Sequence, residues 1–239
     1  MRKDHRPYAV KRAILKWERY YTRHFVQPQF AHLGRGAAFM KPWHVQLFGD
    51  PIVMGAFATV IGAPDGKVRL SVWSRRPGQG GIRIGRYVLI CPGVRISSAD
   101  TITIGDNCML ANRVYVSDSD WHDVYNRTAF GKSSPVRIGD NVWIGDSAIV
   151  SKGVTIGRNT VVGAGAVVVH DLPANCVAAG NPARVVKPLD PQKSLVKRQQ
   201  WFADPDRLAR DFAALDRDML AGNSLFGWLR ALLRPTRDD

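Results

Sequence analysis

The chain has 239 residues, of which 45% are hydrophobic and 23% are charged, which is ordinary for a soluble globular protein with one sizeable core. No apolar run reaches about 18 residues, so a membrane-spanning helix is not expected. The N-terminus also lacks the uninterrupted apolar block of a cleaved signal peptide. The 3 cysteines lie far apart without a CxxC pair, which fits a reducing compartment. We therefore expect a cytoplasmic protein.

The formal net charge of +14 and the sequence pI of about 10.2 leave three explanations open. Nucleic acid is not the expected partner, because no helix-turn-helix, RNA-recognition or zinc-finger pattern accompanies the charge. A basic face for an acidic ligand, such as a phosphorylated cofactor, or contact with the inner face of an anionic membrane fits better. An unspecialised basic surface is equally compatible with these numbers.

Residues 1–41 are expected to form a helical N-terminal extension. Apolar side chains recur there at helical spacing, among them Val10, Trp17, Tyr21 and Phe25, and Pro28 follows the end of the stripe.

Residues 42–189 carry an internal repeat. An aliphatic residue returns at every sixth position through Ile138, Ile144, Val150, Ile156, Val162 and Val168, and earlier through Ile84, Ile90 and Ile96 and through Ile104, Leu110 and Val116. A period of six is neither helical nor a simple strand alternation. A fixed internal repeat predicts a stacked architecture. We predict an all-β solenoid in which each hexad is a short strand and a turn, three hexads form one coil, and the aliphatic side chains point inward.

Two irregularities modify this repeat. Phe48, Met54 and Val60 keep the step of six, which predicts a further coil ahead of the regular ones. The step between Ile96 and Ile104 is eight, which predicts a two-residue insertion at that corner.

The clearest break in the step lies between two coils, where residues 117–135 are expected to form an extruded loop. This loop holds His122 among three carboxylates, Asp118, Asp120 and Asp123. An imidazole, with a pKa of about 6.5, can take a proton from a hydroxyl or an amine at neutral pH and pass it on. A neighbouring carboxylate would fix its tautomer; Asp120 is favoured, and the other two remain open. Without further support, a lone loop histidine is more often an ordinary surface residue.

The strings NVWIG, GAGAVV and AAGNPARVV lie in the most regular part of the chain. With them, this region resembles the hexapeptide-repeat acyltransferases, in particular the maltose and galactoside O-acetyltransferases. The resemblance implies a left-handed parallel β-helix, a handedness that spacing cannot supply because parallel crossovers are normally right-handed. It also implies a homotrimer with sites between subunits, and acetyl-CoA as the acyl donor.

The resemblance also assigns roles to residues of this chain. His122 becomes the catalytic base, followed by Arg127 as in relatives, while Asp120 stays the favoured supporting carboxylate from its position alone. The resemblance implies Asn112 and Arg127 at the acceptor site, and Trp143, Gly145, Ala164, Gly165 and Arg184 along the coenzyme. From the residues themselves, Trp121 and Tyr125 could form a wall for a sugar ring, and His170 is a candidate for the coenzyme phosphates. A backbone N–H from a coil corner would meet the thioester oxyanion; the sequence does not assign that corner, and Ser147 lies in the matching region. Ordinary turn or packing roles remain the alternative for Asn112, the aromatics and the glycines.

One departure from the family pattern concerns the coenzyme phosphates. Relatives often carry a Thr-Lys pair where this chain has Val169 and His170. The expected lysine is therefore missing, and His170, Lys152 or Arg158 would have to replace it. No metal is expected, since His122 and His170 are the only histidines in the clear repeat region.

These features together predict a coenzyme A-dependent acyltransferase. The expected reaction is O-acetylation of a sugar or of a glycan precursor in polysaccharide biosynthesis. An N-acyltransferase of amino or nucleotide sugars uses the same base chemistry and remains an alternative. A non-catalytic β-helix scaffold or membrane-associated partner protein is the alternative from another class.

Residues 190–239 are expected to form a helical C-terminal extension. Asp204 before Pro205 predicts a helix start, and Gly222 predicts its end. A last short helix is expected to begin near Ser224, with an apolar stripe from Leu225 to Leu233. That stripe suits a membrane surface or the open end of the solenoid, and we favour packing on the solenoid.

Overall fold

The computed structural model describes residues 3–74 and 80–236 of the chain, so residues 1–2 and 237–239 of the expected extensions lie outside it. The chain divides into two compact units. The larger unit is Tyr21–Gln200, and the smaller combines Met1–Tyr20 with Trp201–Asp239. These limits differ from the expected boundaries at 41/42 and 189/190, which stay a prediction.

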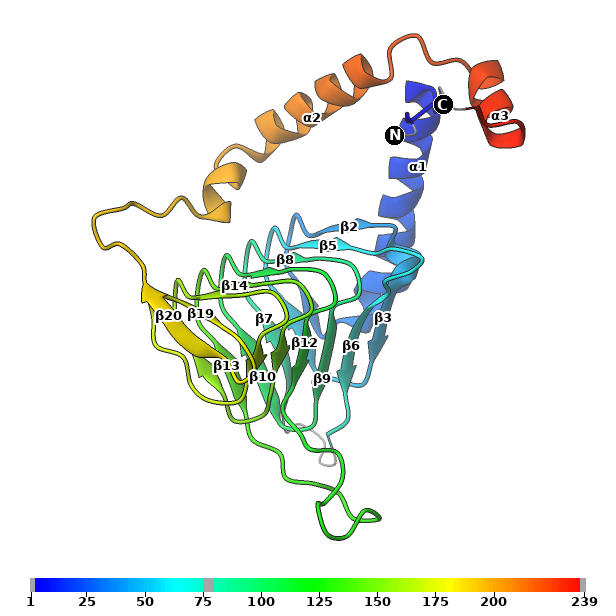
Figure 1. Ribbon diagram of the computed structural model, residues 1–239. Coiled ribbons are helices and arrows are strands. Elements are labelled where there is room, and N and C mark those ends of the chain that lie inside the picture. The colour runs from blue at the N-terminus through cyan, green and yellow to red at the C-terminus, as the bar shows by residue number, and fades with distance from the viewer. Residues whose placement is uncertain (1–2, 75–79, 237–239) are drawn as a thin grey trace. The chain divides into compact units, whose positions relative to one another are not determined.

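The larger unit is a stack of coils whose three sides are parallel sheets (Figure 1). Sheet A contains β1 (His32–Leu33), β4 (Ile52–Met54), β7 (Gly81–Ile84), β10 (Thr101–Ile104), β13 (Val136–Ile138) and β16 (Thr155–Ile156). Sheet B contains β2 (Ala38–Met40), β5 (Thr59–Ile61), β8 (Leu89–Ile90), β11 (Met109–Leu110), β14 (Trp143–Ile144), β17 (Val161–Val162), β19 (Cys176–Ala179) and the antiparallel β20 (Arg184–Pro188). Sheet C contains β3 (Val45–Phe48), β6 (Val68–Val72), β9 (Arg95–Ser98), β12 (Tyr115–Ser117), β15 (Ile149–Val150) and β18 (Val167–Val168).

The aliphatic residues of the six-residue repeat form the core of this stack of coils. Ile138 pairs in register with Ile156, and Ile144 with Val162. Each of the six aliphatics of the regular stretch is at most 2% exposed. The predicted stack of parallel strands with inward aliphatics, and with helices at both ends of the chain, is confirmed. The left-handed winding stays a prediction.

Asparagines stabilise the edge between sheets A and B. Asn141, Asn159 and Asn175 adopt φ values of 57°, 59° and 57°, a left-handed conformation that asparagine tolerates better than most residues. The side-chain amide of Asn141 donates to Asn159 (3.0 Å), and that of Asn159 donates to Asn175 (2.7 Å). Successive coils are therefore joined by side chains as well as by the sheets.

The first coils begin earlier and in a different register than the step of six predicts. Strands β1 and β2 already pair with β4 and β5, ahead of residue 42. Met54 and Val60 are buried as expected, but Phe48 is 54% exposed, so its predicted inward position is wrong. Leu47 pairs with the buried Leu70, which turns its neighbour Phe48 to the outer face. Constant spacing fails there because the corner before β4 is longer than a regular one.

The smaller unit is helical. It contains most of α1 (Tyr8–Tyr21), together with α2 (Pro205–Met219) and α3 (Leu225–Leu233). Asp204 accepts the N–H of Arg207 (2.8 Å), and Ser224 accepts that of Gly227 (3.0 Å), so both predicted helix starts are confirmed. Short helical turns cover Thr22–Val26, Gln27–Gln29, Pro42–His44 and Arg198–Phe202. Within the described ranges, no helix combines the length and the apolar character that crossing a membrane requires.

Candidate active site

An extended arm, residues 118–135, leaves the coil between β12 and β13, at the edge where sheet C passes to sheet A (Figure 1). Its two sides are joined by hydrogen bonds. The N–H of Asp120 donates to the carbonyl of Lys132 (3.1 Å), and the N–H of Asp123 donates to that of Ala129 (3.0 Å). Ser119 and Ser133 form an antiparallel bridge nearer the coil. The extruded loop is therefore a paired ribbon with defined geometry.

Asp118 anchors the root of the arm. Its carboxylate is fully buried and accepts the hydroxyl of Ser98 (2.7 Å) and the N–H groups of Ala99 (2.6 Å) and Asp100 (3.0 Å). Burial raises the pKa of Asp118, although these hydrogen bonds act in the opposite direction. Ala99 and Asp100 fill the corner that the eight-residue step predicted to be enlarged. The insertion thus supplies the donors that hold the arm to the preceding coil.

The other two carboxylates also have partners of their own. Asp120 forms an ion pair with Lys152 of the next coil (2.7 Å). Asp123 accepts the N–H groups of Tyr125 (2.9 Å) and Asn126 (2.8 Å), and these backbone hydrogen bonds lower its pKa. Among the described residues, no carboxylate is hydrogen-bonded to the His122 ring. The contact that was expected from Asp120 is replaced by an ion pair that holds the arm to the coil.

The His122 ring is held by the arm's own backbone. Its Nδ1 lies 3.0 Å from the carbonyl oxygen of Arg127. Because a carbonyl only accepts hydrogen bonds, Nδ1 must carry the proton in this contact, and Nε2 of the neutral ring keeps its lone pair. The exposed imidazole is therefore presented as a proton acceptor. Sequence reasoning missed this partner, because a main-chain carbonyl has no residue signature.

The aromatic and basic residues of the arm separate into two groups. Trp121 is half-buried and donates its indole N–H to Ser117 (3.1 Å), so it packs the arm onto its root. Tyr125 is 96% exposed at the tip, and Arg127 is exposed beside it, with Nε donating to the carbonyl of Val124 (3.0 Å). Tyr125 and Arg127 thus share the tip with His122, whereas Trp121 follows the packing alternative.

Most of the expected coenzyme residues lie along a different edge, where sheet B passes to sheet C. Ala164 and Gly165 form one corner of this B–C edge, and Asn112 lies at the corner two coils before. Arg184 is exposed and pairs in register with Ala179 at the end of β19. Trp143 is 48% exposed on the outer face of sheet B, beside this edge. His170 lies apart from them, at the C–A edge after β18.

The B–C edge carries a row of available backbone donors. Within the described parts of the chain, the N–H groups of Asn112, Asp146 and Ala164 have no hydrogen-bond partner. They recur once per coil, which is about 4.8 Å between paired strands. The N–H of Ser147 already donates to the carbonyl of Asn112 (2.8 Å), so the oxyanion role expected of Ser147 does not fit. Asp146, one residue earlier, is exposed, and its N–H has no hydrogen-bond partner among the described residues.

The two glycines of this region have different roles. A Cβ on Gly145 would lie 2.6 Å from the backbone nitrogen of Ala164, so this glycine is needed where successive coils approach each other. Gly165 has φ of +66°, and a Cβ there would meet nothing within 4 Å. Gly145 therefore sets the spacing between coils, whereas Gly165 leaves the edge open to a ligand.

The comparisons with known proteins concern the coil. Residues 135–170 match the family model described as bacterial transferase hexapeptide (six repeats). The resemblance to hexapeptide-repeat transferases is confirmed over these residues. Galactoside O-acetyltransferase of Escherichia coli (strain K12) is 40% identical over 111 residues, which are 46% of this chain and 55% of that protein. The chain thus spans about half the length of this relative.

Two solved structures are also similar. A maltose O-acetyltransferase from Clostridium difficile 630 has a TM-score of 0.40 at 26% identity, covering 74% of this chain and 89% of its own. A hexapeptide-repeat-containing acetyltransferase from Vibrio cholerae O1 biovar eltor, complexed with acetyl coenzyme A, has a TM-score of 0.43 at 21% identity, covering 76% and 88%.

No group of three or more His, Cys, Asp or Glu side chains in the described ranges is placed to hold an ion. The arrangement instead offers two separate elements: a base with a fixed tautomer on the arm, and a row of backbone donors on the B–C edge. Sheet C lies between these two edges of one coil.

Proposed function

We propose that this protein is an acetyl-CoA-dependent O-acetyltransferase that modifies a hydroxyl of a sugar or glycan precursor in the cytoplasm. The observation that carries the proposal is the 3.0 Å contact between His122 Nδ1 and the Arg127 carbonyl. It leaves Nε2 free to accept a proton, at the tip of an arm that interrupts an otherwise regular transferase repeat.

In the proposed reaction, Nε2 of His122 takes the proton of the acceptor hydroxyl. The oxygen of that hydroxyl attacks the thioester carbonyl at the same time. A carbon–oxygen bond forms and the carbon–sulfur bond breaks. His122 then returns the proton to the leaving thiolate, so no other co-reactant is needed. The Arg127 carbonyl stabilises the imidazolium between these steps. Asp120 supports the base indirectly, because its ion pair with Lys152 fixes the arm.

The B–C edge is the proposed binding site for the donor. Asp146 and Ala164 are exposed residues whose N–H groups have no partner in the described parts of the chain, and these donors suit the amide carbonyls of a pantetheine arm and the developing oxyanion. Gly165 allows close approach, and Arg184 would bind a phosphate. Trp143 flanks the edge, and His170 reaches this site only if it comes from another copy.

A homotrimer is part of the proposal, because it would bring the two edges together. His122 and the B–C edge lie on opposite borders of sheet C in one chain. A neighbouring copy can place its B–C edge against the arm, so that each site takes its base from one copy and its donor site from the next. The left-handed winding expected from the resemblance belongs to this same arrangement.

The acceptor is proposed to contact the arm tip and the nearby coil. Tyr125 offers an exposed ring for stacking on a sugar, Arg127 offers hydrogen-bond donors, and Asn112 offers a polar side chain if it belongs to the adjoining copy. The similarity to a galactoside O-acetyltransferase supports a hydroxyl acceptor. Trp121 contributes to acceptor binding only indirectly, by packing the arm onto its root.

The test is an acceptor screen. Purified protein is incubated with acetyl-CoA and matched pairs of hydroxyl and amino sugars, and coenzyme A release and acetylated products are measured. We expect transfer to hydroxyl acceptors and not to their amino counterparts. Transfer only to amines would replace O-acetylation by N-acetylation, and no transfer together with no binding of acetyl-CoA would support a non-catalytic scaffold.

A further inference from the structure

The helix α3 has an exposed apolar face. Leu225, Phe226, Leu229, Leu232 and Leu233 are between 50% and 81% exposed. At 3.6 residues per turn, these five side chains share an arc of about 120° on one side of the helix. So many large apolar side chains on nine residues are unusual for a surface that only faces water.

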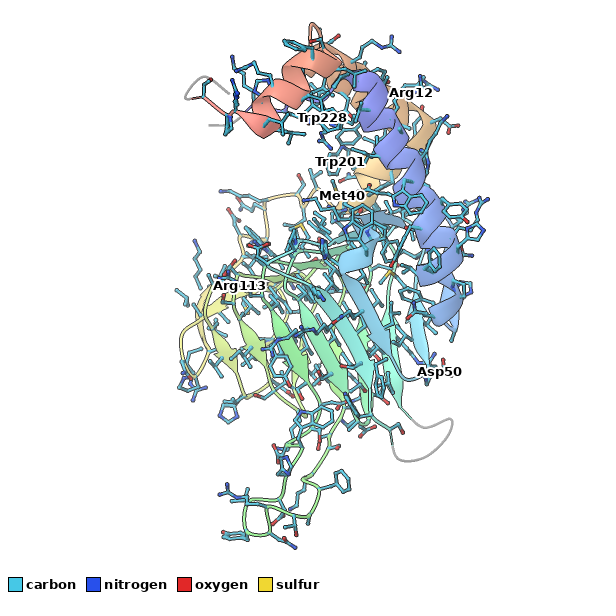
Figure 2. The ribbon with its side chains drawn as sticks, turned by 90° about the vertical axis from the view of Figure 1, so that its right-hand side faces the viewer. Arg12, Met40, Asp50, Arg113, Trp201 and Trp228 are labelled. Atoms are coloured by element: carbon cyan, nitrogen blue, oxygen red, sulfur yellow. The ribbon has the colours of Figure 1, made fainter. Side chains whose placement is uncertain are left out.

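The opposite side of α3 is already packed within its own unit. Trp228 and Ala231 are half-buried and, with Leu232 at the border of the arc, line a pocket of about 200 Å³ together with residues 3–6. Figure 2 labels Trp228 on this helix. The side chain of Asn223, just before the helix, donates to the carbonyls of Asp4 (2.6 Å) and Arg6 (3.1 Å). The helix is therefore oriented by its inner side, and the exposed arc is available for another partner.

Basic residues border this arc. By helical position, Arg230 lies about 40° beyond Phe226, and Arg234 follows as the C-cap. The stretch from Leu225 to Arg234 contains no acidic residue. An apolar arc with basic residues along one border, and no acidic residue from Leu225 to Arg234, is the pattern of a helix that lies in a membrane interface.

We propose that α3 docks on an anionic lipid surface, with its apolar arc in the acyl boundary and its arginines among the headgroups. Nine residues make a helix about 13.5 Å long, which lies in the interface and does not cross it. A second copy of α3 is a poorer occupant of this arc, because it would place the same two arginines, Arg230 and Arg234, against each other. Anionic headgroups complement that charge.

The experiment is co-sedimentation of the full chain with vesicles of phosphatidylcholine, alone or mixed with phosphatidylglycerol. The test variant is Phe226→Asp, and its control is Val196→Asp. Both positions are equally exposed, at 81% and 82%, so the same charge is added on α3 and away from it. Neither change removes a buried contact, and circular dichroism of both variants checks that the fold is kept.

We expect wild type to bind the mixed vesicles, and salt to weaken that binding. Phe226→Asp should weaken binding at least about tenfold, while Val196→Asp stays within about twofold of wild type. Changing Arg230 and Arg234 together to Gln should remove the preference for phosphatidylglycerol.

The proposal is overturned if wild type binds neither vesicle. It is also overturned if both Asp variants lose binding equally, since general charge would then decide. A sedimentation coefficient that falls with Phe226→Asp, without vesicle binding by wild type, would assign the arc to a second copy. An unchanged coefficient without vesicle binding would leave packing on the chain's own coil as the role of α3.

Discussion

Replacing Asp118 by alanine tests how the arm is held to the coil. The change removes the acceptor of two backbone N–H groups, those of Ala99 and Asp100. The hydroxyl of Ser98 keeps a partner, because it also lies 3.3 Å from the Gly81 carbonyl. An unsatisfied buried donor costs about 1–3 kcal/mol. Both donors belong to half-buried residues that water can reach, so we take the lower end, about 2 kcal/mol in total.

For a chain of this size, a loss of about 2 kcal/mol lowers the melting temperature by about 4–8 °C. The assay is thermal unfolding followed by circular dichroism, with Ser98→Ala as the matched control, which leaves both backbone donors satisfied. We expect Ser98→Ala to melt within about 4 °C of wild type. The reasoning is refuted if Asp118→Ala melts at the same temperature as Ser98→Ala.

The difference in melting temperature between wild type and Asp118→Ala should also depend on pH. Because the pKa of Asp118 is raised in the folded state, its favourable contribution is complete below the ordinary aspartate pKa and declines as pH rises through the raised pKa. Asp118→Ala cannot titrate at this position. The gap in melting temperature between wild type and variant should therefore narrow from acidic to neutral pH, and a gap that widens would contradict the assigned pKa direction.

Three further predictions concern the edges and the core. Asn159→Ala should cost about 1 kcal/mol more than Asn159→Gly in urea unfolding, since both lose the side-chain ladder but only alanine strains the left-handed backbone; equal costs would refute the strain. Burial raises the pKa of Cys108 to about 12, so iodoacetamide at pH 8 should modify Cys91 slowly and Cys108 only after unfolding, as peptide mass spectrometry would show. Gly165→Asn should raise the KM for acetyl-CoA with little change in stability, whereas Gly222→Asn, also at an open left-handed position, should leave that KM unchanged.

The sequence predicted the coil well because a six-residue step is a local constraint that every strand must satisfy. The inward positions of Ile138, Ile144 and Val150 follow from spacing alone. The same rule failed at Phe48, because the corner before β4 is longer: the position that pairs with the core, Leu47, lies seven residues before Met54, and the outward Phe48 lies six before it. Which side chains point inward therefore depends on the number of residues in each corner. The spacing of aliphatic residues reveals that number only where the repeat is regular.

The site was less predictable from sequence than the coil. The break in the step located the arm and His122, because a loop must leave the coil where the period stops. It could not show that Arg127 holds the ring through its carbonyl, or that Asp120 turns to Lys152, which lies 32 residues away along the chain. Those contacts depend on how the ribbon folds back and on which coil lies next to it.

The most direct measurement compares kcat/KM for acetyl transfer in wild type and His122→Ala, with the same hydroxyl acceptor. General base catalysis contributes about 10²–10⁴-fold, so we predict a loss of that size. Binding of acetyl-CoA, measured by calorimetry, should stay unchanged. His32→Ala, at an exposed histidine on the first coil, should keep the wild-type rate. A His122→Ala protein that transfers acetyl groups at the wild-type rate would contradict the role assigned to the arm.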